Sequence, residues 1–156
     1  FQSTRLMGVN FDQHVPEEAY EYPIGKSRIV KNGNDVTLIG IGTTTQTCIQ
    51  AAEKLTTLGY EAEVVDLLSI SPIDEETILE SINKTRKVVI VDEDYPKCSV
   101  ASELSALAAE KAFDFLDAPP KRVTAPHALV PYSSVLEALH PPRAEKIVEA
   151  SLEVLE

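Results

Sequence analysis

The stretch of residues 34–67 constrains the fold more than any other part of the chain. It begins with an apolar run rich in β-branched residues, Val36–Ile41, which is typical of a strand buried on both faces. A glycine-containing turn follows, and apolar residues then recur at helical spacing before a second apolar run, Ala62–Leu67. This order predicts a right-handed βαβ unit, and therefore a sheet that is at least partly parallel.

The turn of this unit shares part of a dinucleotide-binding fingerprint. Gly40 and Gly42 follow the first strand, and Asp66 ends the second, where an acid would bind a ribose hydroxyl. The third glycine of that fingerprint is replaced by Thr45. We therefore favour a structural turn, in which the hydroxyls of residues 43–45 cap the helix, and we keep a stand-alone nucleotide-binding module as the alternative.

The remaining sequence predicts further strands and helices around this unit. Residues 27–30 form a short first strand, and the Asn32-Gly33 turn predicts that it pairs antiparallel with Val36–Ile41. The later elements are a helix that begins at Asp74, a buried strand at 87–91, a helix after Pro96, a short strand at 121–125 and a helix at 143–155. Together they predict an α/β fold, a three-layer α/β/α sandwich with a mixed, mostly parallel five-stranded sheet.

The N-terminal residues have a different character from the rest. Residues 1–3 look like the remnant of an expression tag. Residues 4–26 have no steady period and contain two prolines, so we expect a linker from a missing N-terminal domain. The domain itself is expected over residues 27–156.

Composition narrows the classes of partner. The net charge of −11 argues against nucleic acid or an anionic membrane surface as partner. It suits a basic patch on another protein, and the alternative is that the charge serves solubility alone. No apolar run approaches the roughly 20 residues that a membrane helix needs. The two cysteines, Cys48 and Cys98, form no metal-ligand or redox pattern.

Two groups of residues are candidates for chemistry. The acidic run 92–94 follows a buried strand at the end where α/β sheets bind ligands, so a metal or acid–base role competes with simple capping of the next helix. Since no histidine stands at ligand spacing, we favour capping. His14, His127 and His140 belong to no nucleophile motif. The residues therefore predict an α/β domain without an active site of its own.

Ten short segments, taken in order, carry a resemblance to a known family: VPEE (15–18), YPIGK (22–26), DVT (35–37), AEVVDL (62–67), SPIDEETI (71–78), VIVDE (89–93), AFDFLDAP (112–119), KRVT (121–124), VPY (130–132) and LE (136–137). With these segments the chain resembles the C-terminal, transketolase-type domain of the β subunit of thiamin-diphosphate-dependent 2-oxo acid dehydrogenases, the E1 component. It departs from many relatives at residues 97–101, where they carry glycines. The equivalent domain of another transketolase-type enzyme, such as transketolase itself or deoxyxylulose phosphate synthase, is a further alternative.

The resemblance implies a whole enzyme that decarboxylates a 2-oxo acid, with pyruvate favoured, on thiamin diphosphate and transfers the acyl group to lipoamide. The family's cofactor lies between the α subunit and the N-terminal domain of the β subunit. We therefore expect no catalytic, cofactor-binding or metal-binding residue in this domain, and no activity from it alone, whereas the complete enzyme uses thiamin diphosphate and Mg²⁺. Such enzymes lie in the bacterial cytoplasm or, in eukaryotes, in the mitochondrial matrix or plastid.

The resemblance also implies partners. In this family the domain contacts the E1 α subunit and a second E1 β subunit, and it helps to dock the subunit-binding domain of the E2 acyltransferase. The aspartate of the Leu-Asp-Ala-Pro motif takes part in docking in relatives, and here it is Asp117. The alternative for Asp117 is a loop aspartate that hydrogen-bonds its own backbone before a proline.

Overall fold

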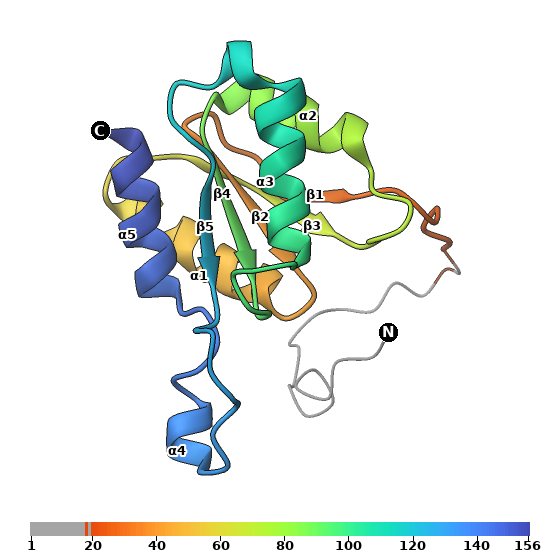
Figure 1. The fold of residues 1–156 in the computed structure, drawn as a ribbon. Helices are drawn as coiled ribbons and strands as arrows, with labels where there is room; N and C mark the ends of the chain where they lie inside the picture. The colour runs from red at the N-terminus through yellow and green to blue at the C-terminus, as the bar shows by residue number, and fades with distance from the viewer. Residues whose placement is uncertain (1–17, 19) are drawn as a thin grey trace.

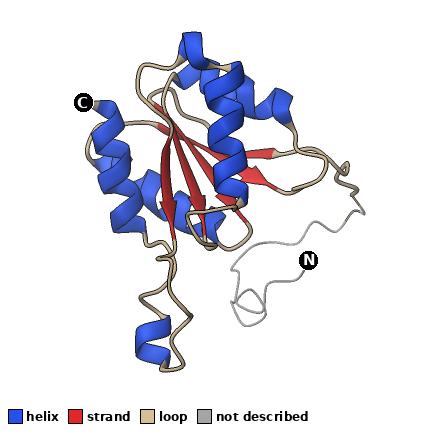
Figure 2. Cartoon of the chain, viewed as in Figure 1, coloured by secondary structure: helices blue, strands red, loops and turns tan. Residues whose placement is uncertain are grey.

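The chain forms one five-stranded sheet with helices on both faces (Figure 1, Figure 2). This computed structural model describes residue 18 and residues 20–156. The tag remnant expected at 1–3, most of the linker expected at 4–26, and His14 lie outside the described residues. None of the described helices is long and apolar enough to cross a membrane.

The strands are β1 (Arg28–Lys31), β2 (Val36–Ile41), β3 (Ala62–Leu67), β4 (Val88–Asp92) and β5 (Lys121–Thr124). The helices are α1 (Thr44–Thr57), α2 (Glu75–Thr85), α3 (Val100–Lys111), the short α4 (Ser134–Glu137) and α5 (Ala144–Leu155), with a 3₁₀ turn, η2 (Phe113–Phe115), after α3. The strand order is β1-β3-β2-β4-β5, and only the pairing of β1 with β3 is antiparallel. The predicted mixed, mostly parallel sheet is confirmed.

The predicted partner of the first strand was wrong. β1 pairs with β3 and not with β2, so the Asn32-Gly33 segment makes no hairpin. Instead the chain crosses the start of β3, where the backbone N–H groups of Asn34 and Asp35 both donate to the carbonyl of Glu61, at 2.9 and 3.0 Å. A Cβ on Gly33 would lie 2.2 Å from the carbonyl carbon of Ala62, so only glycine fits this crossing.

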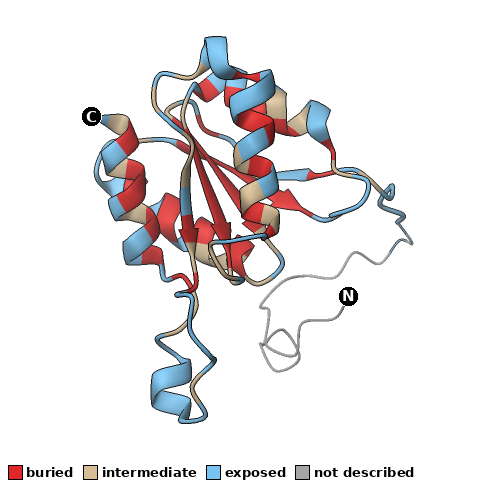
Figure 3. Cartoon of the chain, viewed as in Figure 1, coloured by how far each residue is buried: buried red, intermediate tan, exposed pale blue. Residues whose placement is uncertain are grey.

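Alternate residues of the central strand serve the two faces of the sheet. Val36 and Leu38 join a core cluster with residues of α1 and α5, whereas Ile39 joins a second cluster with residues of α2 and α3. Figure 3 shows the central strands β2, β3 and β4 and the inward sides of these helices as buried. The three-layer sandwich therefore has one apolar core on each side of the sheet.

Asp74 is the N-cap of α2, as the sequence predicted, and it also holds the edge strand β1. Its carboxylate accepts hydrogen bonds from the N–H and the hydroxyl of Thr77, at 3.5 and 2.7 Å. The same carboxylate accepts from the N–H of Ser27, at 2.8 Å, directly before β1. One buried side chain thus joins the start of α2 to the start of the antiparallel strand.

Removal of Ile90 tests the burial of β4. Ile90 is fully buried between two neighbouring strands, so Ile90→Ala should lower the free energy of unfolding by about 2–5 kcal/mol. Ile24→Ala is the control, because Ile24 is 91% exposed and its truncation should cost less than about 0.5 kcal/mol. Urea unfolding measures both, and equal stability of the two variants would contradict the position of β4.

Substitution at Gly33 tests the crossing over β3. Gly59 has a positive φ of 91° and open space where a Cβ would stand, so Gly59→Ala should cost only the ~1–2 kcal/mol of a left-handed residue. Gly33→Ala should cost more, because the added methyl meets backbone atoms of β3 that cannot move without loss of hydrogen bonds. If thermal melts showed Gly33→Ala to be the more stable variant, the crossing would be wrong.

Candidate docking surface

At the edge of the sheet where α/β folds bind ligands, several side chains bond to one another and to the backbone. The connections of β2 and β4 lead to opposite sides of the sheet, so the switch point lies between these strands. Here Thr43 donates to Glu93 at 2.6 Å, and Thr44 donates to the carbonyl of Val91 at 2.8 Å. These hydroxyls do not cap α1 as predicted, because they bridge to the next strand instead.

The dinucleotide-like turn serves packing. Gly40 is needed because a Cβ there would lie 2.5 Å from the Cα of Thr45, where α1 begins. Asp66 is buried, with 6% of the residue exposed. Its carboxylate accepts hydrogen bonds from the hydroxyl of Thr45 at 2.7 Å and from the guanidinium of Arg28 at 3.0 Å. A buried acid that is bonded within the fold favours the structural turn over recognition of a ribose.

The acidic run 92–94 caps the following helix. Asp92 accepts from the N–H of Ala101, in the first turn of α3, and from the N–H of Asp94, both at 3.1 Å. Asp94 accepts from the N–H of Tyr95 at 2.7 Å. Across residues 18 and 20–156, no three His, Cys, Asp or Glu side chains are grouped so that they could hold a metal ion. These contacts favour the capping interpretation.

The other candidate residues also have local roles or none. His127 packs edge-on against Tyr95, with 5.1 Å between ring centroids. Cys48 is fully buried, and this burial, aided by the charge of Asp66, raises the pKa of its thiol far above the usual range. Cys98 is exposed in the loop before α3.

Asp117 lies in the loop after η2 and is held by the end of α2. Arg86, the C-cap of α2, has a left-handed backbone with φ of 62°, and its carbonyl accepts from the N–H of Asp117 at 2.9 Å. Its guanidinium donates from Nε and Nη2 to the two carboxylate oxygens, at 2.9 and 2.7 Å. Sequence reasoning missed this partner, since the residues stand 31 positions apart and glycine is usual at such a cap.

The ion pair changes the titration of both groups. The hydrogen bonds from Arg86, more than its charge or that of Lys87, hold the pKa of Asp117 below its usual range. The same bonds raise the pKa of Arg86. Asp117 is nevertheless accessible, with 44% of its side chain exposed, and each carboxylate oxygen has a lone pair left to accept from another molecule.

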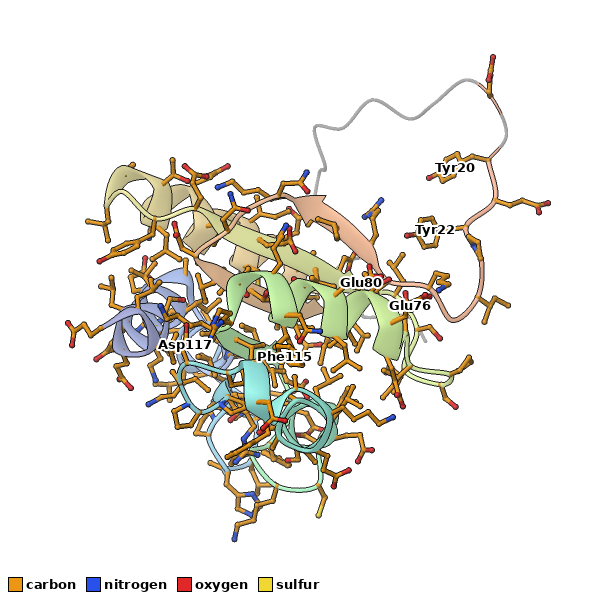
Figure 4. All side chains as sticks on the ribbon, turned by 90° about the horizontal axis from the view of Figure 1, so that it is seen from above. Tyr20, Tyr22, Glu76, Glu80, Phe115 and Asp117 are labelled. Carbon is orange, nitrogen blue, oxygen red and sulfur yellow. The ribbon has the colours of Figure 1, made fainter. Side chains whose placement is uncertain are left out.

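Two exposed aromatic residues precede Asp117 in the chain. Phe113 and Phe115 in η2 are 73% and 48% exposed, and Figure 4 shows Phe115 close to Asp117, far from Tyr20 and Tyr22 on the segment that leads to β1. These residues are the candidate site, and we call Arg86, Phe113, Phe115 and Asp117 the docking surface. Aromatic and arginine side chains are enriched in protein-binding sites.

Comparisons with known proteins agree with the fold. Residues 25–147 match the family described as "Transketolase, C-terminal domain". The chain is 49% identical to the β subunit of acetoin:2,6-dichlorophenolindophenol oxidoreductase from Bacillus subtilis, over 94% of this chain and 43% of that protein. It is 40% identical to the mitochondrial pyruvate dehydrogenase E1 β subunit of Dictyostelium discoideum, over 98% of this chain and 44% of that protein.

Among solved structures, a split-gene transketolase described as an inactive β4 tetramer is 27% identical, with a TM-score of 0.74, over 87% of this chain and 44% of that chain. The present chain thus spans less than half the length of these relatives.

Replacement of Arg86 tests the ion pair. Arg86→Gln removes the two charged donors but keeps the backbone bonds, so the pKa of Asp117 should rise towards the ordinary value of about 3.9. Because the folded-state pKa is lowered, the pair stabilises the fold above that ordinary value and loses its effect as the pH falls through the lowered pKa. A carbon-13 NMR titration of the carboxyl measures the shift.

The matched control is Lys87→Gln, since Lys87 acts on Asp117 only through its charge and should move the pKa less. An unchanged pKa in Arg86→Gln would show that the pair does not form in solution.

Proposed function

This chain belongs to the transketolase C-terminal domain family, and from that membership we propose that it is the C-terminal assembly and docking domain of an E1 β subunit. The observation that carries the proposal is the exposed ion pair of Arg86 and Asp117 near Phe115, on a domain whose threonines after β2 bond within the chain. Identities of 40–49% to β subunits of acetoin and pyruvate enzymes support it. We further propose that residues 27–156 form the domain and that 4–26 link it to an N-terminal domain.

We propose that the whole enzyme uses thiamin diphosphate and Mg²⁺ and that this domain binds neither. The residues at the carboxyl edge of the sheet do not fit such a group. Asp92 already accepts two backbone N–H groups, and Thr43 and Glu93 are bonded to each other. A diphosphate needs free backbone donors and a Mg²⁺ ligand, and neither is offered by these contacts.

The substrate of the whole enzyme is pyruvate or acetoin. We expected pyruvate from the sequence, but the relative with the higher identity of the two β subunits compared is named for acetoin, which favours acetoin. The ratio of kcat/KM for the two compounds, measured with the assembled enzyme, decides between them.

For docking, we propose that a basic segment of the E2 subunit-binding domain contacts the docking surface. The net charge of −11 favours encounter with a basic partner. Arg86 lies within 3 Å of the carboxylate and therefore cancels part of its attraction, so burial of Phe113 and Phe115 has to supply much of the affinity. The partner shares Asp117 with Arg86 and does not replace it.

For assembly, we propose that the domain contacts an E1 α subunit and a second β subunit. The solved transketolase neighbour is described as a β4 tetramer, which is an assembly of one kind of subunit. Association of β subunits with each other is therefore a property of a relative with the same fold, and we extend it to this chain.

A calorimetric titration of the chain with the subunit-binding domain of its own acyltransferase tests docking. Asp117→Ala should weaken binding by about tenfold, because one interfacial contact of this kind contributes on the order of 1–2 kcal/mol. Arg86→Gln should strengthen binding, because it removes the competing positive charge and leaves Asp117 unpaired. Binding of the wild type should weaken as salt is added.

Glu53→Ala is the control for net charge, since Glu53 is an exposed acid on α1, on the opposite face of the sheet. If the Asp117→Ala and Glu53→Ala variants bound the subunit-binding domain with the same dissociation constant, docking would not use this surface. Because Asp117 is exposed, its removal should hardly change the melting temperature, which separates a binding effect from unfolding.

A further inference from the structure

Arg86 ends α2 in a backbone conformation that an arginine rarely adopts. Its φ is 62°, in the left-handed region where glycine is usual at the end of a helix. Such a conformation persists in a residue with a side chain only where the surrounding structure holds it, and residues held in this way gather at functional sites. We therefore looked for the contacts that fix the backbone of Arg86.

The residues on either side of Arg86 are joined by a side chain. The hydroxyl of Thr85 donates to the carbonyl of Lys87 at 3.0 Å, across Arg86. The same carbonyl accepts from the backbone N–H of Thr37, in β2, at 2.8 Å. Arg86 thus lies in a short turn whose two ends are bonded to each other and, through Lys87, to the central strand of the sheet.

A cluster of three buried hydroxyls orients Thr85. Thr37 Oγ1 lies 2.8 Å from Ser81 Oγ and 2.7 Å from Thr85 Oγ1, and all three residues are buried. Each hydroxyl has one proton to donate. Thr85 Oγ1 is nearer to the carbonyl of Lys87, at 3.0 Å, than to that of Ser81, at 3.2 Å, so we assign its proton to Lys87. Thr37 then donates to Thr85, Ser81 donates to Thr37, and the side chain of Thr85 has one fixed orientation.

An ion pair also ties the last turn of α2 to the sheet. Lys84 donates to one carboxylate oxygen of Glu63, in β3, and the side chain of Glu63 is buried. Among the described residues the other carboxylate oxygen has no hydrogen-bond partner. A buried carboxylate that loses its cation is strongly destabilising, so this pair keeps the end of α2 on the sheet. Loss of the Thr85 hydroxyl should therefore loosen Arg86 without detaching the helix.

We propose that Thr85 is a positioning residue for the docking surface, because its hydroxyl holds Arg86 in the conformation from which the guanidinium reaches Asp117. The inference rests on the proposed function, in which Asp117 is offered to a partner. It names the buried side chain that sets how strongly Arg86 competes for that carboxylate. A surface contact is thus controlled from inside the fold, by a residue that no partner touches.

A carbon-13 NMR titration of the Asp117 carboxyl in Thr85→Val tests the proposal. Valine keeps the shape of threonine but lacks the hydroxyl, so Arg86 loses the bond that spans it. The pKa of Asp117 should then rise towards its ordinary value, as in Arg86→Gln but less far. Thr85→Ser keeps the hydroxyl and should keep the wild-type pKa. In an Arg86→Gln background Thr85→Val should change nothing, because Thr85 acts on Asp117 through Arg86.

Ser151→Ala is the matched control for loss of a buried hydroxyl. Ser151 is buried and donates to the carbonyl of Ile147 within α5, on the other face of the sheet. Its removal should lower the melting temperature and leave the pKa of Asp117 at the wild-type value. Thr85→Ala is a second test variant in case Thr85→Val does not fold, since alanine removes the hydroxyl and adds no methyl group to the polar cluster.

Three results would overturn the proposal. The first is a wild-type pKa of Asp117 in folded Thr85→Val or Thr85→Ala, and the second is a pKa in Thr85→Ser raised as far as in Thr85→Val. The third is a rise that persists in the Arg86→Gln background, which would mean that Thr85 acts by another route. No partner is present in this titration, so a failure of docking would contradict the proposed function and leave this result unaffected.

Discussion

The whole domain depends on the burial of β2, whose first five residues are all buried. This strand lies between β3 and β4 and is covered by helices on both faces, so every polar group on it needs a partner inside the protein. Its one polar side chain, Thr37, meets this requirement with Ser81 at 2.8 Å and Thr85 at 2.7 Å, both on α2. The same constraint explains Gly40, which lets α1 start against the strand without a void.

At the carboxyl edge of the sheet, polar side chains likewise bond to partners within the chain. Thr43, Thr44 and Thr45 bond to three different partners on or just after neighbouring strands, and Asp92 bonds to the start of α3. These side chains are therefore engaged inside the fold. The outside of the domain carries the exposed pair of Arg86 and Asp117 and a run of exposed apolar side chains between residues 129 and 139.

The sequence predicted the parts of this fold that local pattern determines. The βαβ unit, the order of elements and the cap at Asp74 follow from apolar periodicity and from a residue that bonds its own neighbours. The pairing partner of β1 does not follow from local pattern, since a strand next to a turn can pair with either of two parallel neighbours. The close contact of Gly33 with β3 decides between them.

The candidate site was predictable only in part. The interest in Asp117 came from its sequence motif. Its bonds to Arg86 could not be predicted, because the two residues stand 31 positions apart and the left-handed backbone conformation of Arg86 leaves no periodic pattern in the sequence. The threonines after β2 show the same limit. Threonine is a residue type that suits a helix cap. In the folded chain the hydroxyls of Thr43 and Thr45 instead bond to Glu93, just after β4, and to Asp66 in β3.

The bonds between Arg86 and Asp117 have a consequence for how the domain can respond to a partner. They join the two ends of a segment that contains β4, α3 and η2, and so close it into a ring. Opening this ring would release conformational entropy but would break the bonds between Arg86 and Asp117. While these bonds are made, the two ends of the segment stay together. A partner that requires Asp117 to move has to break its bonds to Arg86 first. Binding to the closed ring as it stands is therefore favoured over induced fit.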